Sequence, residues 1–330
     1  MAVDSKFRIL SIDGGGIRGL VPALVLLDLE QRLERITDEK RPLSDYFHLF
    51  AGTSTGGLIS LGLTAPDPMD ATQLVELYKE RGPKIFPTRF RFLRMLLGFI
   101  KPKFSNRGLE RAVKEEIGES PLSDALRDVV ITAYDMTEHA PVFFKRWKAR
   151  ADGPNPTMAD AAIATASAPT YLPPFELDGH ALVDGGVFAA NPTVAAIAEA
   201  LKRDSDDVGL EDLFVVSLGT GFFKVAYAPK RLRSWGALAW IWPRGSEPAL
   251  MRAMLDGQTA SADHWAATLL NRGPEPRYYR VEAELGDDFE MDDARRKTLD
   301  GLEAKARQVI GERDGDLDAI AQHLAAAGPV

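Results

Sequence analysis

The chain has 330 residues, of which 45% are hydrophobic and 27% charged, an ordinary globular composition that excludes wholesale disorder. Lys and Arg total 40 and Asp and Glu total 48, so the net charge is −8, which counts against a protein that binds a nucleic-acid polymer. The absence of cysteine excludes disulfides, Cys-ligated zinc, iron–sulfur clusters and thiol nucleophiles.

Neither a signal peptide nor a membrane-spanning segment is expected. Residues Met1 to Lys6 lead directly into Phe7–Leu10, without an apolar stretch before a small-residue cleavage site. No run approaches 18 consecutive apolar residues, the length typical of a transmembrane helix. We therefore expect a soluble, cytoplasmic protein whose membrane contact, where it occurs, is peripheral and at the inner face.

Apolar runs alternate with amphipathic segments along the chain. The first run, Phe7–Ile12, precedes a glycine cluster, and after it Val21, Val25, Leu29 and Leu33 recur every four residues, which predicts a helix. Glycine-bounded strands that alternate with helices are typical of an α/β sheet covered by helices. Further strands are predicted at 46–51, 129–133, 142–144, 213–217 and 278–281, a helix start at Gly57, and Ala-rich helices after Leu285.

The first glycine cluster has two interpretations. Gly14–Gly19 fits the G-x-G-x-x-G pattern of dinucleotide-binding loops, but Asp38 and Glu39, at the right distance for a ribose contact, directly follow a helix and not a strand. Alternatively, successive glycine N–H groups at the start of a helix form a cradle for the oxyanion of an acyl-transfer transition state. Arg18 either adds a nearby cation or pairs with a structural carboxylate.

A candidate nucleophile follows the second predicted strand. Gly52–Gly56 fits G-x-S-x-G, in which a sharp strand-to-helix turn presents the Ser54 hydroxyl and glycines allow the close crossing of strand and helix. The alternative is that Ser54 is a plain helix N-cap.

The base for that serine is less obvious. The two histidines late enough for a catalytic triad, His264 and His323, both lie in helix-like sequence. Asp184, in the run Leu182–Gly186, follows a short apolar stretch and precedes two glycines. A carboxylate is a weak base unless burial or hydrogen bonding raises its pKa, and Asp-Gly-Gly is alternatively a β-turn.

Three motifs taken together resemble the patatin-like phospholipases. That family's signature is D-G-G-G-x-R-G, then G-x-S-x-G, then D-G-[GA], and this chain has Asp13–Gly19, Gly52–Gly57 and Asp184–Gly186 in the same order. The similarity covers roughly residues 7–225, and nothing specific is recognised in 226–330. The resemblance implies a patatin-like three-layer α/β/α fold with a mostly parallel central sheet, as one catalytic domain over 1–330 with 226–330 packed on its core.

The resemblance further implies a lipid acyl hydrolase of the phospholipase A or lysophospholipase type that uses a serine–aspartate dyad. Ser54 would attack the ester carbonyl, and Asp184 would accept its proton and later activate water. Neither a metal nor an organic cofactor is implied. The oxyanion hole would comprise Gly14, Gly15, Gly16 and Arg18, and the supporting glycines would be Gly19, Gly52, Gly56, Gly185 and Gly186.

The partners that follow are a membrane phospholipid or another glycerolipid. Residues 89–104 and 231–252 mix basic with aromatic and aliphatic side chains, as lipid-docking segments do, although ordinary core-facing helices are the alternative. Two further hypotheses remain. The chain is similar to bacterial membrane-degrading anti-phage effectors activated by cyclic dinucleotides, and a storage or binding protein on an inactive scaffold is the non-enzymatic alternative.

Overall fold

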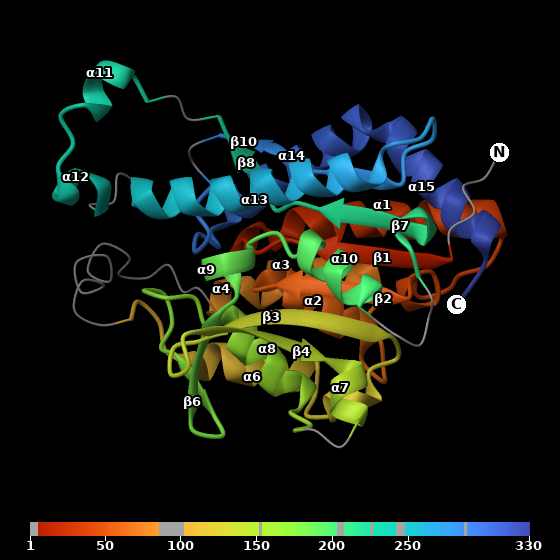
Figure 1. Ribbon diagram of the computed structural model, residues 1–330, viewed down its shortest axis with the longest axis horizontal. Helices are drawn as coiled ribbons and strands as arrows, with labels where there is room; N and C mark the ends of the chain where they lie inside the picture. The colour runs from red at the N-terminus through yellow and green to blue at the C-terminus, as the bar shows by residue number, and fades with distance from the viewer. Residues whose placement is uncertain are drawn as a thin grey trace.

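The computed structural model describes residues 6–85, 102–151, 154–202, 208–224, 227–241, 248–286 and 289–330, and shows helices on both faces of a central sheet (Figure 1). The sheet has eight strands, and its path runs β5-β6-β3-β2-β1-β7-β9, with β4 paired to β3. The neighbouring strands β3, β2, β1, β7 and β9 pair in parallel. Strands β4 and β6 pair antiparallel with β3, and β5 pairs antiparallel with β6. The predicted three-layer α/β/α fold with a mostly parallel sheet is therefore confirmed.

All of the strands predicted from the sequence exist, with changed boundaries. The second begins at Leu49 and not at Tyr46, because a short 3-10 turn at Leu43–Asp45 occupies the residues before it. A hairpin that the sequence analysis missed, β5 with β6, precedes Asp184. The strands are β1 (Phe7–Ile12), β2 (Leu49–Thr53), β3 (Asp128–Asp135), β4 (Ala140–Lys145), β5 (Phe175–Leu177), β6 (His180–Asp184), β7 (Leu213–Leu218), β9 (Tyr278–Val281), and the separate pair β8 (Phe222–Phe223) and β10 (Glu284–Leu285).

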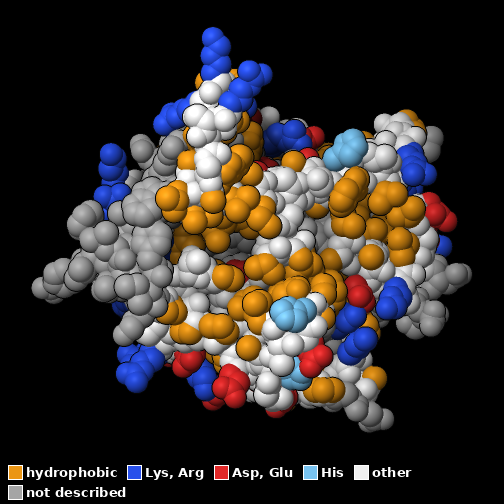
Figure 2. All heavy atoms as spheres, turned by 60° about the vertical axis from the view of Figure 1, so that its left-hand side comes forward, with side chains coloured by type: hydrophobic (Ala, Val, Ile, Leu, Met, Phe, Trp, Pro, Cys, Tyr) orange, Lys and Arg blue, Asp and Glu red, His pale blue; other side chains and the backbone are white. Residues whose placement is uncertain are grey.

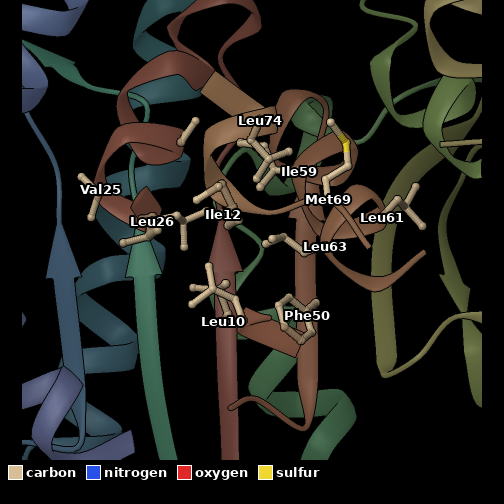
Figure 3. Close-up of a cluster of buried hydrophobic side chains, with 14 of the residues drawn as sticks. Leu10, Ile12, Val25, Leu26, Phe50, Ile59, Leu61, Leu63, Met69 and Leu74 are labelled. Atoms are coloured by element: carbon tan, nitrogen blue, oxygen red, sulfur yellow. The ribbon is translucent and has the colours of Figure 1, made fainter. Parts of the chain in front are cut away.

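The central strands are buried on both faces, as expected of parallel strands covered by helices. Leu10 and Ile12 of β1 pack into the larger core cluster, and Phe7 and Ile9 into the smaller one. Figure 3 shows part of the larger cluster, in which Leu10 and Ile12 lie near Phe50 of β2 and side chains of the helices above.

Helices of the two layers supply the rest of each core. The larger cluster takes side chains from α1, α2, α3, α6, α8, α14 and α15, and the smaller from α10 and α13. The helices are α1 (Leu20–Thr37), α2 (Thr55–Thr64), α3 (Ala71–Glu80), α4 (Gly82–Ile85), α6 (Asn106–Glu116), α7 (Arg146–Arg150), α8 (Met158–Ala166), α9 (Gly186–Ala189), α10 (Thr193–Leu201), α11 (Pro229–Leu232), α12 (Ala237–Ile241), α13 (Ala249–Leu270), α14 (Arg296–Glu312) and α15 (Asp314–Ala327).

Two strands meet end to end beside β3. Strand β2 pairs with β3 up to Thr132, and β6 pairs with it from Ala133 onward, in the opposite direction. Strand β4 pairs with β3 across both stretches and so occupies the other edge. Since one edge of a strand accepts one partner at each residue, β2 and β6 share the same edge of β3. Their carboxyl ends, Thr53 and Asp184, therefore point toward each other.

The region after residue 225 contributes to the same sheet. Strand β9 pairs with β7 in parallel, and α14 and α15 both contact α1. No helix in the ranges given above is long and apolar enough to span a bilayer. That the chain forms one catalytic domain over 1–330 stays a prediction.

Candidate active site

Ser54 occupies a strained turn between β2 and α2. Its φ of 53° and ψ of −123° lie where side-chain-bearing residues are rare, and its N–H donates to Thr165 Oγ1 at 2.8 Å. Gly56 is required by the close crossing, since a Cβ there would lie 2.1 Å from the carbonyl oxygen of Ile12. Ser54 makes no side-chain capping bond, so the alternative of a plain N-cap is wrong.

Asp184 ends β6 in a buried position beside Ser54. One carboxylate oxygen accepts the Gly186 N–H at 2.7 Å, and Ser54 and Asp184 line the same cavity. Burial raises the pKa of Asp184 to about 6, although the nearby Ser54 side chain and the Gly186 N–H act to lower it. The residues after it form the short helix α9, so the β-turn alternative is also wrong.

The glycine loop lies directly over the nucleophile. A Cβ on Gly14 would lie 3.3 Å from the Ser54 Cβ, and Gly14, Gly15 and Gly16 line the same cavity as Ser54 and Asp184. The Gly14 N–H, however, donates to the Ala190 carbonyl oxygen at 2.9 Å. The prediction that Gly14 supplies an oxyanion donor is therefore wrong, because its N–H is already used.

The N–H groups of Gly15 and Gly16 are the other two candidate donors of the loop. Within the described ranges, Gly15 and Gly16 donate to no protein acceptor. Their orientation is set from behind, since Thr220 Oγ1 donates to the Gly14 carbonyl oxygen at 2.6 Å and Arg18 Nε to the Gly15 carbonyl oxygen at 3.3 Å. In a planar trans peptide the N–H points opposite to the C=O, so both N–H groups point away from these donors.

Arg18 serves the loop and not an ion pair. Besides its bond to Gly15, its guanidinium lies 5.1 Å from the centre of the Phe223 ring. Among the described residues no carboxylate pairs with it, so the alternative of a structural ion pair is wrong. The remaining motif glycines allow close packing. A Cβ added at Gly19 would lie 2.3 Å from Tyr78 Oη, and one at Gly52 would lie 2.3 Å from the Gly56 carbonyl oxygen. A Cβ added at Gly185 would lie 2.1 Å from Thr132 Oγ1, and one at Gly186 would lie 3.2 Å from Asp184 Oδ1.

A cavity of about 670 Å³ opens over these groups. Apart from the residues just described, its lining is mainly aliphatic and aromatic, from α3 and α6 on one side and from β8 and α13 on the other. Figure 2 shows hydrophobic side chains around a hollow on this face. A serine hydroxyl, a carboxyl group and two backbone N–H groups thus line the same mainly apolar pocket, the set of groups that acyl transfer requires.

Comparison with known proteins identifies the family. The family model described as "Patatin-like phospholipase" matches residues 10–197. Patatin-like protein 2 of Arabidopsis thaliana is 35% identical, over 92% of this chain and 82% of that protein. The chain belongs to the patatin-like phospholipase family. Patatin-15 of Solanum tuberosum, another relative of this patatin-like chain, is 30% identical over 91% of the chain and 82% of its own length.

Solved structures add little to that assignment. VipD from Legionella pneumophila covers 94% of this patatin-like chain and 67% of its own chain, with 13% identity and a TM-score of 0.43. The family membership indicates a lipid ester hydrolase, whereas the roles of individual residues rest on the geometry.

The rival interpretations of the patatin-like site fail on geometry. The acidic residue proposed for a dinucleotide ribose, Asp38, ends α1 in a left-handed conformation, and no strand lies between that helix and it. No histidine lines the cavity: His264 lies on α13, and His323 stacks on Phe214 with ring centres 3.8 Å apart. In the part of the chain that the structure describes, no cluster of three or more His, Asp or Glu side chains could hold a metal ion.

Three residues of the site were missed by the sequence analysis. Thr165 accepts the Ser54 N–H, Thr220 donates to Gly14, and Arg280 binds Asp13 of the glycine motif through two hydrogen bonds of 2.9 and 2.6 Å. Thr220 lies within residues 7–225, the stretch that resembles the family, but none of the three motifs includes it. Thr165 and Arg280 stand in ordinary helix and strand sequence, so no local pattern marks them.

Proposed function

We propose that this protein hydrolyses acyl esters of membrane lipids, with Ser54 as nucleophile and Asp184 as general base. The observation that carries the proposal is the buried Asp184 carboxyl group, which lines the same apolar cavity as Ser54 and the glycine loop. A base with a pKa of about 6 is mostly ionised at neutral pH and still has useful proton affinity. This explains how a serine hydrolase works without a catalytic histidine.

The proposed reaction has two halves. In the first, Ser54 Oγ attacks the ester carbonyl carbon while its proton passes to Asp184. The oxyanion that forms accepts hydrogen bonds from the N–H groups of Gly15 and Gly16. Collapse breaks the ester bond, and the leaving alcohol takes the proton from Asp184. In the second, a water molecule loses a proton to Asp184 and attacks the acyl-serine, which releases the fatty acid and returns the proton to Ser54.

The cavity supports a substrate with a long acyl chain. Its volume of about 670 Å³ lies within the usual range for small-molecule sites, and most of the side chains that surround Ser54, Asp184 and the glycine loop are apolar. A fatty acyl chain would bury its methylene groups along the apolar walls, and each buried methylene would contribute about 0.8 kcal/mol of favourable free energy. We therefore propose phospholipase A or lysophospholipase activity.

A fluorophosphonate probe tests the nucleophile directly, because it phosphonylates an activated serine. We expect peptide mass spectrometry to find the adduct on Ser54. Incubation with mixed phospholipid vesicles should release free fatty acids, measured by product mass spectrometry. A protein that takes up the probe nowhere and releases no fatty acid would instead support the storage or binding alternative.

The partner that we propose is a lipid bilayer, contacted through a projecting arm beside the cavity. This arm, residues 227–241 with α11 and α12, extends from the body at the upper left of Figure 1. Leu238 and Ile241 are 73% and 50% exposed, and Ile241 also lines the cavity. Basic side chains, Lys230 and Arg231, lie on the same arm, so apolar and cationic groups suit an anionic interface.

Aromatic packing gives the arm its own structure. Trp235 meets Trp240 edge to face with ring centres 5.2 Å apart, and Tyr227 meets Trp235 in the same way at 5.2 Å. The tryptophans are thus partly buried in the arm, which leaves Leu238 as the most exposed apolar side chain. Of the other segment predicted to dock, 89–104, only residues 102–104 lie within the described residues, so it is carried no further.

Leu238→Asp is expected to weaken this docking. A charge on the exposed arm loses the apolar contact and is repelled by anionic lipid, so the fraction that sediments with phosphatidylglycerol vesicles should fall severalfold. Ile36→Asp, at another exposed apolar position, on α1, is the control and should sediment like the wild type. Equal sedimentation of the two variants would contradict docking through the arm.

The alternative hypothesis, that cyclic dinucleotides activate the hydrolase, is tested by adding a panel of these nucleotides to the vesicle assay and measuring fatty-acid release.

A further inference from the structure

We propose that Thr220 and Arg280 are positioning residues that hold the glycine loop in its oxyanion-binding shape. This inference rests on the proposed acyl hydrolysis at Ser54. Neither residue lies within 10–197, the segment that the family model matches. The brace of the catalytic loop would therefore come from outside that matched segment.

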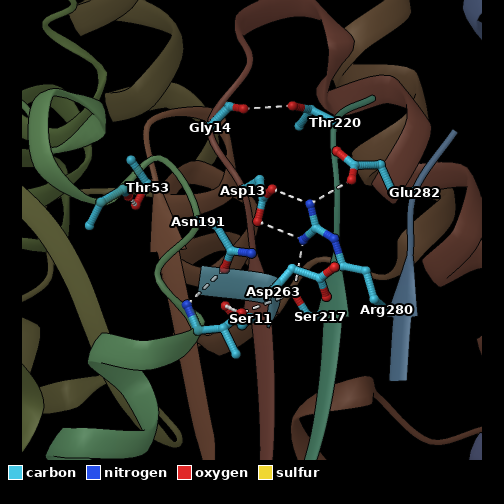
Figure 4. A network of polar contacts seen from close by, with 12 residues as sticks. Ser11, Asp13, Gly14, Thr53, Asn191, Ser217, Thr220, Asp263, Arg280 and Glu282 are labelled. Atoms are coloured by element: carbon cyan, nitrogen blue, oxygen red, sulfur yellow. Dashed lines mark hydrogen bonds and ion pairs between the residues drawn. The ribbon is translucent and has the colours of Figure 1, made fainter. Parts of the chain in front are cut away.

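Thr220 fixes the first of the two donor peptides. Its hydroxyl donates to the Gly14 carbonyl oxygen at 2.6 Å, and the peptide plane then directs the Gly15 N–H away from Thr220. Gly15 itself lines the cavity. The contact is tight, because a Cβ on Gly15 would lie 2.2 Å from Thr220 Oγ1. Figure 4 shows Thr220, which follows β7, reaching the Gly14 carbonyl.

Arg280 fixes the start of the loop. Its guanidinium holds Asp13 through two hydrogen bonds and also contacts Ser217 Oγ at 2.9 Å and a carboxylate oxygen of Glu282 at 3.0 Å (Figure 4). Asp13 is buried and directly precedes Gly14, and its N–H donates to the Leu218 carbonyl oxygen at 3.0 Å. Such a two-pronged pair fixes both the position and the rotation of the carboxylate.

A third contact closes the brace on the far side of the loop. The Ile17 N–H donates to the Met291 carbonyl oxygen at 2.9 Å, and a Cβ on Gly16 would lie 2.4 Å from the same oxygen. The loop is thus held at Asp13, Gly14 and Ile17 by residues after position 213. Gly15 and Gly16, between these points, keep their N–H groups for the substrate. Neither Arg280 nor Met291 needs to touch the reacting atoms for this effect.

Thr220→Val tests the brace with little change of shape. Without the hydroxyl the Gly14 peptide can rotate, and a small misplacement of a donor lowers the rate, so kcat should fall about tenfold to a hundredfold while KM changes less than twofold. Affinity for a trifluoromethyl ketone, which forms a tetrahedral oxyanion adduct, should fall by the same factor. Thr64→Val is the matched control, since Thr64 is equally buried and donates to the Ser60 carbonyl oxygen at 2.8 Å, at the far end of α2.

Arg280→Lys tests the second contact. Lysine keeps the positive charge but cannot hold both oxygens of Asp13 in one plane, so we expect kcat to fall about tenfold or more with KM unchanged. Arg32→Lys is its control, because Arg32 is also buried and binds carboxylates of Asp28, Asp314 and Asp318. It lies on α1, where α1 meets α15, outside the cavity lining. That variant should lose thermal stability and keep kcat.

The outcomes separate this inference from the proposed function. If wild type hydrolyses lipid, Ser54→Ala is inactive, and both brace variants keep kcat within twofold, the brace is refuted and the hydrolase stands. A fall in kcat matched by an equal fall in the control variants would also refute it, as a general loss of structure. If the wild type itself has no hydrolase activity, the proposed function fails first; ketone affinity, measured by calorimetry, then still shows whether the variants disturb the oxyanion site.

Discussion

Ser54→Ala is expected to abolish lipid hydrolysis, with a fall in kcat on the order of 10⁴-fold or more. The covalent route needs the Ser54 hydroxyl, and among the described side chains of the cavity lining only that hydroxyl acts on the pKa of Asp184. The measurement is fatty-acid release from phospholipid vesicles, with circular dichroism to verify the fold.

Two variants sharpen this prediction. Ser60→Ala removes another buried hydroxyl of α2, which donates to the Ala51 carbonyl oxygen at 3.2 Å, and should leave hydrolysis near the wild-type rate. Ser54→Gly should be inactive but more heat-stable than Ser54→Ala, because glycine accepts a φ of 53° without strain. Hydrolysis by Ser54→Ala at more than a hundredth of the wild-type rate would identify a different nucleophile.

Asp184→Asn is expected to lower kcat about 10³- to 10⁴-fold. The asparagine oxygen can still accept the Gly186 N–H, so the local structure should persist, but the amide cannot take the Ser54 proton. Fluorophosphonate labelling of Ser54 should slow in parallel, and its second-order rate constant is the measurement. Labelling at the wild-type rate would show that Asp184 is not the base.

The same substitution should change the pH dependence and the stability. The pKa of Asp184 is about 6 in the folded protein against an ordinary value of 3.8, so the ionised group destabilises the fold above pH 3.8, with the full effect above pH 6. Two pKa units correspond to about 3 kcal/mol, and Asp184→Asn should therefore raise the thermal midpoint at pH 7. Wild-type kcat/KM should fall about tenfold per pH unit below pH 6, and the variant should lose this acid limb.

Asp135→Asn is the matched control of opposite sign. Burial acts to raise the pKa of Asp135, but hydrogen bonds from the Thr137 N–H and from His180 lower it below its ordinary value. Its ionised form therefore stabilises the fold, and that stabilisation is lost only as the pH falls through the lowered folded pKa. Asp135→Asn should lower the thermal midpoint at pH 7. A midpoint that falls in both variants would contradict the raised pKa of Asp184.

The local parts of the site could be predicted from the sequence by itself. Strand β1 and the segment after it follow from an apolar run, a glycine cluster and a four-residue repeat, because strand and helix periods are properties of neighbouring residues. The turn at Ser54 was predictable for the same reason. Gly52 and Gly56 are required wherever a strand and a helix cross that closely, and the motif records this requirement within five residues.

Only the tertiary structure decided which groups meet and which donors remain free. Asp184 lies near Ser54 because β2 and β6 both pair with β3 and end against each other on one edge of it. The two residues are about 130 positions apart, so no periodic pattern in the sequence indicates that they meet. Gly14 looked equivalent to Gly15 and Gly16 until Ala190 was found to accept its N–H. Arg280 likewise became part of the site only through its position opposite Asp13. Local rules determine each segment's conformation, whereas hydrogen-bond partners between distant segments exist only once the sheet has formed.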